Sequence, residues 1–281
     1  MRSGGDSGGK PGQARGPEDQ KRRGDAGPGP GALTVVGLGP GDAALLAPMA
    51  EAALAEAGVV VGYGPYVDLV SPALLAGKDV VATGMTGEVA RCRAALEAAA
   101  AGRRVVLVSS GDAGVYGMAG LALEMLDAMG LPQALDFSVV PGIPAVCAAA
   151  ALLGAPLTHD FAVISLSDLL TPLPVIEARL EAAFAADFVV AIYNPRSRKR
   201  SGHLAEALAR AARHRDPQTP VGMVKNAFRP AQEIRLTSLA QADPDWADML
   251  TLVVVGSTSS RLAAGRFLTP RGYAGKYALE G

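Results

Sequence analysis

The residues best suited to chemistry in this chain lie in one glycine-rich loop, Ser109-Ser110-Gly111-Asp112-Ala113-Gly114-Val115-Tyr116-Gly117-Met118. The apolar run at 105–108 just before it is typical of a strand buried on both faces, so we expect Asp112 at the carboxyl end of a strand. Open α/β sheets bind their ligands at that end, where a carboxylate can accept hydrogen bonds from ribose hydroxyls or lie near a positive charge. The alternative is a turn in which Asp112 only caps the next helix.

A second glycine-rich loop, Gly37-Leu38-Gly39-Pro40-Gly41-Asp42, follows the first predicted strand in the same way. It is not a dinucleotide-binding fingerprint, because Asp42 stands where the third glycine is needed and Val61 runs into Gly62 without an acidic residue to hold a ribose. The sequence also contains no Gly-Lys-Ser/Thr phosphate-binding motif. Two glycine loops that lack a phosphate-binding motif favour a ligand that contains adenosine but no phosphate.

The composition excludes several classes of protein. Hydrophobic residues make up 49% of the 281 residues and charged residues 19%, which is typical of a globular chain. The net charge of −1 gives no field that would attract nucleic acid or an anionic membrane. No apolar run approaches the length of a membrane span. We therefore expect neither nucleic acid nor a membrane as a partner.

Residues 1–31 are rich in glycine, proline and charge, and they have no apolar core of the kind a signal sequence needs. We expect a disordered N-terminal extension and a cytoplasmic protein. Cys92 and Cys147 lie in alanine-rich predicted helices, far apart and without the spacing of metal ligands. We expect both to be small core residues, with no disulfide and no metal site.

Strands and helices alternate from residue 33 onward, which indicates two α/β domains, at 32–142 and 143–275, and a short tail at 276–281. In the first domain we expect strands at 33–36, 59–61, 80–81, 105–108 and 137–140 and helices at 43–57, 88–101 and 119–129. In the second we expect helices at 145–153, 174–185 and 203–213 and strands at 161–166, 188–192, 221–224, 233–236 and, last, 252–255. The first sheet should be mostly parallel and the second mixed, because several strands of the second domain have no helix between them. Two such domains usually hold their ligand in the cleft between them.

Together these motifs resemble those of the tetrapyrrole methylases, S-adenosylmethionine enzymes of cobalamin and sirohaem biosynthesis. The resemblance extends from Leu33 to about Tyr273 and rests on the loop at 37–42, on Gly111-Asp112-x-Gly-x-Tyr-Gly and on Val140-Pro141-Gly142. Three further stretches are similar to the precorrin-3B C-17 methyltransferase branch, which also contracts the macrocycle: Leu166-Ser167-Asp168-Leu169-Leu170-Thr171-Pro172, Tyr193-Asn194-Pro195-Arg196-Ser197 and Val255-Gly256-Ser257-Thr258-Ser259-Ser260. One departure is Ala113, where many relatives have proline, and it removes no contact group.

The resemblance implies a two-domain tetrapyrrole methylase-like α/β fold, a homodimer, and S-adenosylmethionine bound as methyl donor in the cleft between the two sheets. It also implies the residues that hold this donor: Pro40, Ser110, Gly111, Asp112, Val115, Pro144, Ala145, Asn194, Asn226 and Ala227. Adenine binds through backbone groups and small apolar residues, which the pairs Pro144-Ala145 and Asn226-Ala227 provide.

On this resemblance the expected function is methylation of C-17 of precorrin-3B, a tetrapyrrole substrate, with contraction of the ring to precorrin-4. Close alternatives are the same methylation of cobalt-factor III on the anaerobic route, or a sister precorrin methylase acting at another carbon of the macrocycle. A protein that binds an adenosyl ligand without catalysis belongs to a different class and keeps the same fold. The full set of glycine, aspartate and strand-end motifs argues against lost cofactor binding.

Ring contraction needs acid–base help, because a hydroxyl becomes a carbonyl while a carbon migrates. His159, in Leu157-Thr158-His159-Asp160, ranks first for this catalytic role, since histidine titrates near neutral pH. Asp112 is a second catalytic candidate, and Asp168 and Lys225, near predicted strand ends, are weaker ones. A lone histidine before a strand is more often structural, and that alternative stays open for His159.

Overall fold

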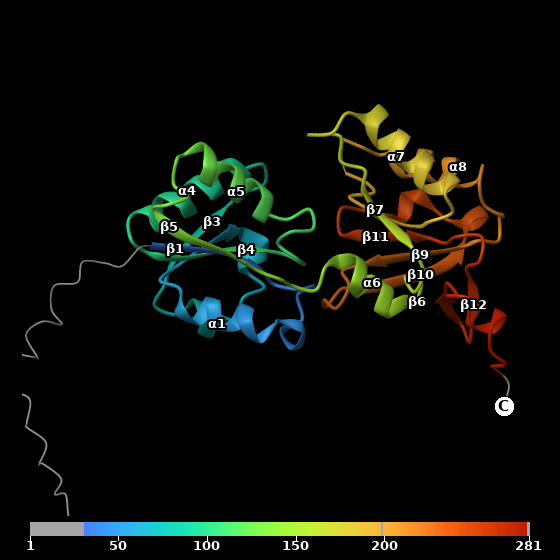
Figure 1. Ribbon diagram of the computed structural model, residues 1–281, viewed down its shortest axis with the longest axis horizontal. Coiled ribbons are helices and arrows are strands. Elements are labelled where there is room, and N and C mark those ends of the chain that lie inside the picture. The colour runs from blue at the N-terminus through green and yellow to red at the C-terminus, as the bar shows by residue number, and fades with distance from the viewer. Residues whose placement is uncertain (1–30, 198, 280–281) are drawn as a thin grey trace, which may run out of the picture.

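The computed structural model describes residues 31–197 and 199–279. Within these residues the chain builds two lobes, each a five-stranded sheet covered by helices on both faces (Figure 1). We call residues 31–140 the first lobe and residues 145–268 the second lobe. The chain crosses from one lobe to the other over residues 141–144, between the last strand of the first sheet and the first helix of the second lobe.

The sheet of the first lobe is entirely parallel, with the strand order β3-β2-β4-β1-β5. Its strands are β1 (Gly31–Gly37), β2 (Val59–Tyr63), β3 (Asp79–Thr83), β4 (Arg104–Ser109) and β5 (Leu135–Val140). Because all five strands run in one direction, the carboxyl ends of the neighbouring strands β4, β1 and β5 lie together at one edge of the sheet. The predicted parallel sheet is confirmed.

Helices cover both faces of this sheet: α1 (Pro48–Glu56), α2 (Gly64–Val67), α3 (Pro72–Leu75), α4 (Glu88–Ala100) and α5 (Ala119–Ala128). In Figure 1, α4 and α5 lie above the sheet and α1 below it. Alternate residues of the strands face opposite sides, so Val59 and Val61 pack with Leu96 of α4, whereas Val60 packs with Leu54 of α1. Both faces of the strands are therefore apolar, as a buried parallel sheet requires.

The single helix expected at 43–57 is instead two pieces, and this prediction is wrong. A 3-10 turn (Ala43–Leu45) comes first, and α1 begins only at Pro48. Proline disfavours the helical conformation of the residue before it, and Ala47 is accordingly extended, with φ −63° and ψ 139°. Asp42 caps the 3-10 turn, since its side chain accepts a hydrogen bond from Ala44 N at 2.9 Å.

The sheet of the second lobe is mixed, with the order β10-β9-β11-β8-β7, as the sequence predicts. Its strands are β7 (Phe161–Ser165), β8 (Val189–Tyr193), β9 (Pro220–Lys225), β10 (Glu233–Ser238) and β11 (Thr251–Val255). Strands β7 and β8 are parallel, while β11 is antiparallel to both β8 and β9. The carboxyl ends of β7, β8 and β9 and the amino end of β11 therefore share one edge.

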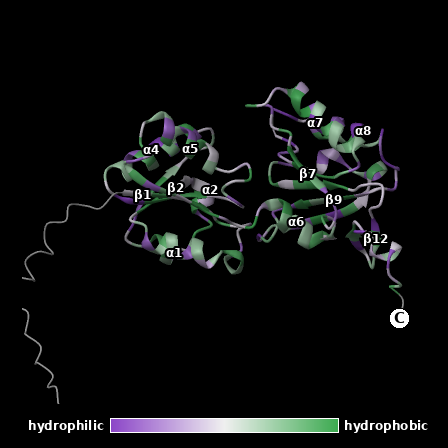
Figure 2. Ribbon diagram, in the orientation of Figure 1, coloured by the Kyte–Doolittle hydropathy of each residue, from purple (hydrophilic) through white to green (hydrophobic). Residues whose placement is uncertain are grey.

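The helices of the second lobe also divide between the two faces of its sheet (Figure 1). Helices α7 (Leu173–Ala185) and α8 (His203–Ala211) cover one face, and α6 (Ala145–Leu153) covers the other. Short 3-10 turns follow at Leu239–Gln241, Pro244–Trp246 and Tyr273–Gly275. Figure 2 shows that the central strands of both lobes are hydrophobic, whereas the helices also present hydrophilic residues.

A small third sheet joins β6 (Gly154–Ala155), β12 (Arg261–Ala263) and β13 (Arg266–Leu268) in the order β12-β13-β6. The expectation that 252–255 is the last strand is therefore wrong. Strands β12 and β13 form a short hairpin whose turn residues, Ala264 and Gly265, both have positive φ. These strands are hard to recognise from sequence because they are three residues long and only Phe267 among them is buried.

The predicted N-terminal extension covers residues 1–31, of which residues 1–30 lie outside the described residues. Its last residue, Gly31, is instead the first residue of β1. Among the residues that the structure describes, no helix is long and apolar enough to cross a membrane. Cys92 is buried in the core as expected, but Cys147 is exposed on α6, so the expectation of a second core cysteine is wrong.

Candidate active site

The two lobes meet at a cleft formed by the edges that hold their strand ends. From the first lobe it is lined by Pro40, Tyr66, Ser110, Gly111, Asp112, Val115 and Tyr116, and from the second by Ala145, Tyr193, Asn194, Val224, Asn226, Ala227, Arg229, Met249, Leu250, Thr251 and Leu252. Both glycine loops recognised in the sequence thus reach the same cleft, and strand ends of the opposite lobe face them.

The three glycine motifs meet because their main chains pack directly against one another. A Cβ atom placed on Gly37 would lie 2.7 Å from Gly111 O and from Gly142 N, and one on Gly142 would lie 2.2 Å from Gly111 O. Gly39 and Gly111 also exchange two backbone hydrogen bonds, of 3.0 and 2.8 Å. The glycines therefore let the ends of β1, β4 and β5 approach closely, which side chains would prevent.

Asp112 fastens the second glycine loop to the end of β5. Its Oδ1 accepts a hydrogen bond from Gly114 N at 2.7 Å, and its Oδ2 accepts one from Gly142 N at 3.0 Å. The helix-cap alternative is wrong, because the N-cap of α5 is Met118 and no side chain caps that helix. Both carboxylate oxygens of Asp112 thus have backbone partners, and the residue sets the shape of this side of the cleft.

Nine of the ten residues expected to hold the methyl donor line the cleft. The tenth, Pro144, caps α6 and lies beside Gly111, since a Cβ on that glycine would be 3.7 Å from Pro144 Cα. Asn194 and Asn226 reach the cleft because each directly follows a strand that ends at this edge, β8 and β9 respectively. Both asparagines have positive φ, of 50° and 48°, which is a backbone conformation that asparagine tolerates better than most residues.

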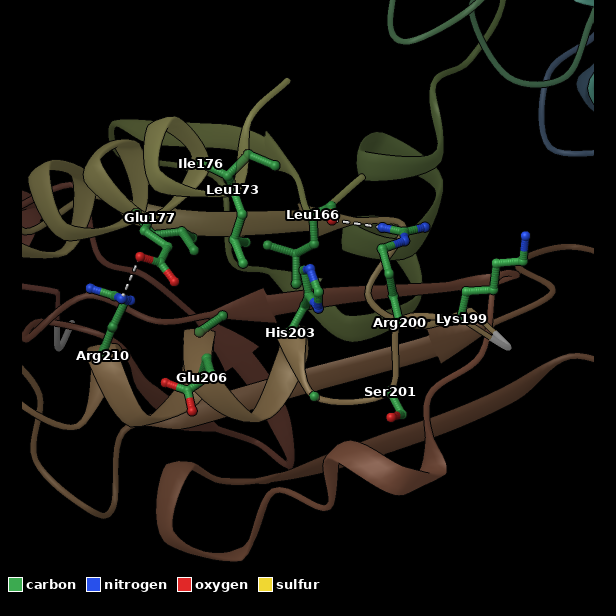
Figure 3. Close-up of a pocket in the computed structure, with 13 residues that line it drawn as sticks. Leu166, Leu173, Ile176, Glu177, Lys199, Arg200, Ser201, His203, Glu206 and Arg210 are labelled. Carbon is green, nitrogen blue, oxygen red and sulfur yellow. Dashed lines mark hydrogen bonds and ion pairs between the residues drawn. The ribbon is translucent and has the colours of Figure 1, made fainter. Parts of the chain in front are cut away.

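A buried arginine holds the strand ends behind Asn194. Arg200 Nη1 donates to Leu166 O at 2.6 Å and to Asn194 O at 3.5 Å, and Figure 3 shows this side chain pointing toward Leu166. The side chain of Asn194 in turn donates from Nδ2 to Ser165 Oγ at 2.9 Å. The position of Asn194 in the cleft is therefore fixed by residues of β7 and of the loop that precedes α8.

Two tyrosines that are not among the ten residues expected to hold the methyl donor lie side by side in the cleft. The ring centroids of Tyr116 and Tyr193 are 5.2 Å apart. Tyr116 has a φ of 52°, and its hydroxyl crosses to the second lobe and donates to Val163 O at 3.1 Å. The hydroxyl of Tyr193 accepts a hydrogen bond from Val146 N at 2.9 Å, and burial raises the pKa of Tyr193 to about 12. Tyr193 therefore keeps its proton at neutral pH.

Arg229 is the other important residue that the sequence did not single out. It lies in the loop between β9 and β10 and reaches across to both glycine loops, where Nε donates to Pro40 O at 2.5 Å and Nη2 to Ser110 Oγ at 2.8 Å. Burial lowers the pKa of its guanidinium. Arg229 stands four residues after the end of β9, and this position could have marked it as a candidate. The sequence does not predict, however, how β9 is oriented relative to the first lobe.

The structure does not bring His159 to the cleft. It precedes the amino end of β7, at the sheet edge opposite the cleft, where its exposed ring accepts a hydrogen bond from Asp160 N at 2.8 Å. Asp168 lies 3.4 Å from both Arg200 Nε and His203 Nε2 and does not line the cleft. Lys225 ends β9, with its ammonium 4.2 Å from the ring centre of Trp246, and does not line the cleft either.

A second hollow lies wholly within the second lobe, between α7, α8 and the segment 199–203 (Figure 3). None of the expected site residues lines it. Two of its charged side chains bind neighbouring residues: Arg210 pairs with Glu177 at 3.0 Å, and Arg200 donates to Leu166 O. The described part of the chain also contains no group of three or more histidine, cysteine, aspartate or glutamate residues that could hold a metal ion.

Comparison with known sequences matches most of the chain. The family of tetrapyrrole (corrin/porphyrin) methylases matches residues 32–243. A Salmonella typhimurium protein named probable cobalt-factor III C(17)-methyltransferase is 52% identical over 243 residues, which are 86% of this chain and 99% of that protein. A cobalt-factor III methyltransferase of Priestia megaterium is 45% identical over 252 residues, or 89% of this chain, and the match spans 46% of that longer protein.

Solved structures match over both lobes. The crystal structure of the methyltransferase CobJ is similar with a TM-score of 0.81 and 42% identity, covering 85% of this chain and 100% of that one. A uroporphyrin-III C-methyl transferase of Thermus thermophilus, complexed with S-adenyl homocysteine, is similar with a TM-score of 0.60 and 25% identity, covering 80% of this chain and 92% of that one. These similarities confirm the two-sheet α/β fold expected from the sequence.

Proposed function

The chain belongs to the tetrapyrrole (corrin/porphyrin) methylases, and we propose that it is a C-17 methyltransferase of cobalamin biosynthesis that takes its methyl group from S-adenosylmethionine. The observation that carries this proposal is the cleft between the lobes, where nine of the ten residues expected to hold the donor come together from five separate segments of the chain. The relatives named as C(17)-methyltransferases and the neighbour solved with S-adenyl homocysteine support it.

The residues of the cleft fit this donor. Ala145 and Ala227 offer small apolar surface on the second lobe, and Asn194 and Asn226 offer amide groups for a nucleobase. Gly111 lines the cleft with a φ of 67° and has no side chain, which leaves room for a ligand beside Ser110 and Asp112. We propose that these residues, with Pro40, Val115 and Pro144, bind S-adenosylmethionine, which supplies a methyl group activated by its positively charged sulfur.

The protein's own contribution is alignment and exclusion of water. Methyl transfer is an in-line displacement, so its rate depends on holding both partners in one geometry. Tyr116 and Arg229 bridge the two lobes by hydrogen bonds to Val163 O, Pro40 O and Ser110 Oγ, and so fix the width of the cleft. A narrow cleft also excludes water from around a positive charge, which strengthens the electrostatic interactions inside it.

We propose Tyr193, in place of His159, as the group that exchanges a proton during ring contraction. Tyr193 lines the cleft, and its hydroxyl accepts a hydrogen bond from Val146 N, which leaves its own proton free to be donated. Because burial raises the pKa of Tyr193 to about 12, the phenol stays protonated at neutral pH, and its O–H group is available as a donor to a ligand. His159 lies at the other edge of the sheet and takes no part in this proposal.

The substrate that we propose is the metal-free macrocycle precorrin-3B, on the resemblance of residues 166–172, 193–197 and 255–260 to the precorrin-3B branch of the family. The second candidate is cobalt-factor III, because the Salmonella typhimurium relative at 52% identity bears that name. The test incubates the protein with S-adenosylmethionine and each macrocycle in turn, and records the mass and absorbance spectrum of the pigment. A gain of one methyl group and a changed chromophore from either macrocycle supports the proposal and decides between the two substrates.

Two other results would overturn the proposal that the protein is a C-17 methyltransferase. Binding of S-adenosylhomocysteine without any methyl transfer would identify an adenosyl-ligand binder, and an isotope-labelled methyl group found at another ring carbon by NMR would identify a sister methylase. We further propose that the protein is a cytoplasmic homodimer, as the family resemblance implies. Light scattering of the purified chain tests the dimer, and a monomer at micromolar concentration would contradict it.

A further inference from the structure

Arg229 has a positive charge that no described side chain balances. Of the described residues that line the cleft, Asp112 and Arg229 are the two charged ones, and both oxygens of Asp112 already accept backbone hydrogen bonds. Arg229 donates to two neutral oxygens instead, and its partial burial lowers its pKa. A half-buried cation without an anionic partner is unfavourable, which indicates that a ligand completes the pair.

The guanidinium of Arg229 is oriented before any ligand arrives. Nε is held by Pro40 O and Nη2 by Ser110 Oγ, while Nη1 makes no hydrogen bond to any residue in 31–197 or 199–279 and is not enclosed by protein. Because Arg229 lines the cleft, this remaining nitrogen is available to a ligand there, with its orientation set by the contacts of the other two. Guanidinium groups bind carboxylates through such directed N–H groups, and they stay charged even where burial opposes it.

The loop that presents Arg229 is strained and firmly braced. Asn226 and Phe228 both have positive φ, of 48° and 56°. Hydrogen bonds within the loop hold this shape: Arg229 N donates to Asn226 O at 2.9 Å, Phe228 N to Gln232 Oε1 at 2.8 Å and Asn226 Nδ2 to Ala231 O at 3.2 Å. Strain of this kind persists where the surroundings enforce it, and it is concentrated at ligand-binding positions.

We propose that Arg229 binds a carboxylate of the ligand in the cleft. This inference rests on the proposed function, which brings two carboxylate-bearing molecules to the cleft: the amino-acid part of S-adenosylmethionine and the acidic side chains of the tetrapyrrole. In both cases the free Nη1 donates to a carboxylate oxygen. The same side chain already contacts both glycine loops, so the carboxylate is held beside Pro40 and Ser110.

The first arm of the test asks whether the carboxylate belongs to the methyl donor. Titration calorimetry measures binding of S-adenosylhomocysteine and of its decarboxylated analogue to wild type and to Arg229→Gln. We expect the substitution to raise the Kd of S-adenosylhomocysteine by about 10- to 100-fold and that of the analogue by less than about threefold, because only the former loses a charge-assisted hydrogen bond. Arg229→Lys, which keeps the charge, should recover part of the affinity.

The second arm asks whether the carboxylate belongs to the tetrapyrrole. In that case Arg229→Gln leaves both titrations unchanged and raises the KM of the macrocycle by about tenfold or more, with a smaller change in kcat. The matched control is Arg235→Gln, which removes the same charge from β10, where Arg235 pairs with Asp243 at 3.6 Å and stacks on Trp246 away from the cleft. The control should behave as wild type in both arms.

An equal loss of affinity for S-adenosylhomocysteine and its decarboxylated analogue would overturn the inference, because it would show that Arg229 only holds the two lobes together. Unchanged titrations with an unchanged KM would overturn it as well. If wild type itself binds neither nucleoside, the proposed function fails instead, so the two failures are distinguishable. The melting temperature of each variant shows whether it is folded, and Arg229→Lys replaces Arg229→Gln if the latter is not.

Discussion

Replacement of Asp112 by alanine separates a structural role of this carboxylate from a ligand-binding one. The side chain joins two segments that are far apart in sequence, since Oδ1 accepts from Gly114 N in its own loop and Oδ2 from Gly142 N at the end of β5. Asp112→Ala removes both acceptors at once. Asp112→Asn keeps one oxygen acceptor, and it is therefore the matched milder change.

The expected magnitude follows from the two hydrogen bonds. A hydrogen bond to a charged group contributes about 1.5–3 kcal/mol when it is shielded from water. The contact with Gly114 N is exposed, so water replaces it, whereas the contact with Gly142 N is partly buried. We therefore expect Asp112→Ala to lower the free energy of unfolding by about 2 kcal/mol, or the melting temperature by about 4–6 °C. Asp112→Asn should fall between this variant and wild type.

Binding should weaken along with stability, because the loosened loop includes Ser110 and Gly111. If re-ordering this loop costs about 1.4 kcal/mol, the Kd of S-adenosylhomocysteine rises about tenfold. The assays are thermal unfolding without ligand and titration calorimetry with S-adenosylhomocysteine. A wild-type melting temperature together with a large loss of affinity would refute the reasoning, since the carboxylate would then act on the ligand and not on the loop.

Three further predictions test other parts of the structure. Tyr193→Phe should bind S-adenosylhomocysteine normally yet form the ring-contracted product about 10²-fold more slowly in single-turnover mixtures, while His159→Gln, as its control, keeps the wild-type rate. Removal of residues 1–30, which are rich in glycine, proline and charge, should change neither melting temperature nor turnover. A thiol reagent at pH 8 should label Cys147 in the native protein and Cys92 only after unfolding, because burial raises the pKa of Cys92 to about 11.

Much of the fold could be predicted because it depends on local patterns. Runs of β-branched residues such as 59–61 and 105–108 became strands buried on both faces, and their alternation with helices indicated the parallel sheet. The failures also have local causes: Pro48 divides a stretch that is helical by composition, and the strands of the β12–β13 hairpin are too short to form an apolar pattern.

The candidate site was predictable where a residue directly follows a strand. Asn194 and Asn226 reached the cleft for this reason, and the glycine motifs at 37–42 and 111–117 met because their strands are neighbours in a parallel sheet. His159 shows the limit of the same rule. It lies next to a strand in sequence, but at the amino end of that strand, and so the fold places it at the opposite edge from the cleft.

The sequence by itself determined the strands, the helices, the close-packed glycine loops and the family to which the chain belongs. Only the tertiary structure decided that Arg229 crosses to Pro40 and Ser110, that Tyr116 and Tyr193 stand together, and that the amino end of β11 completes the cleft. The physical reason is that local propensity acts over a few residues. Contacts between the lobes depend on how two complete sheets pack, which no short stretch of sequence specifies.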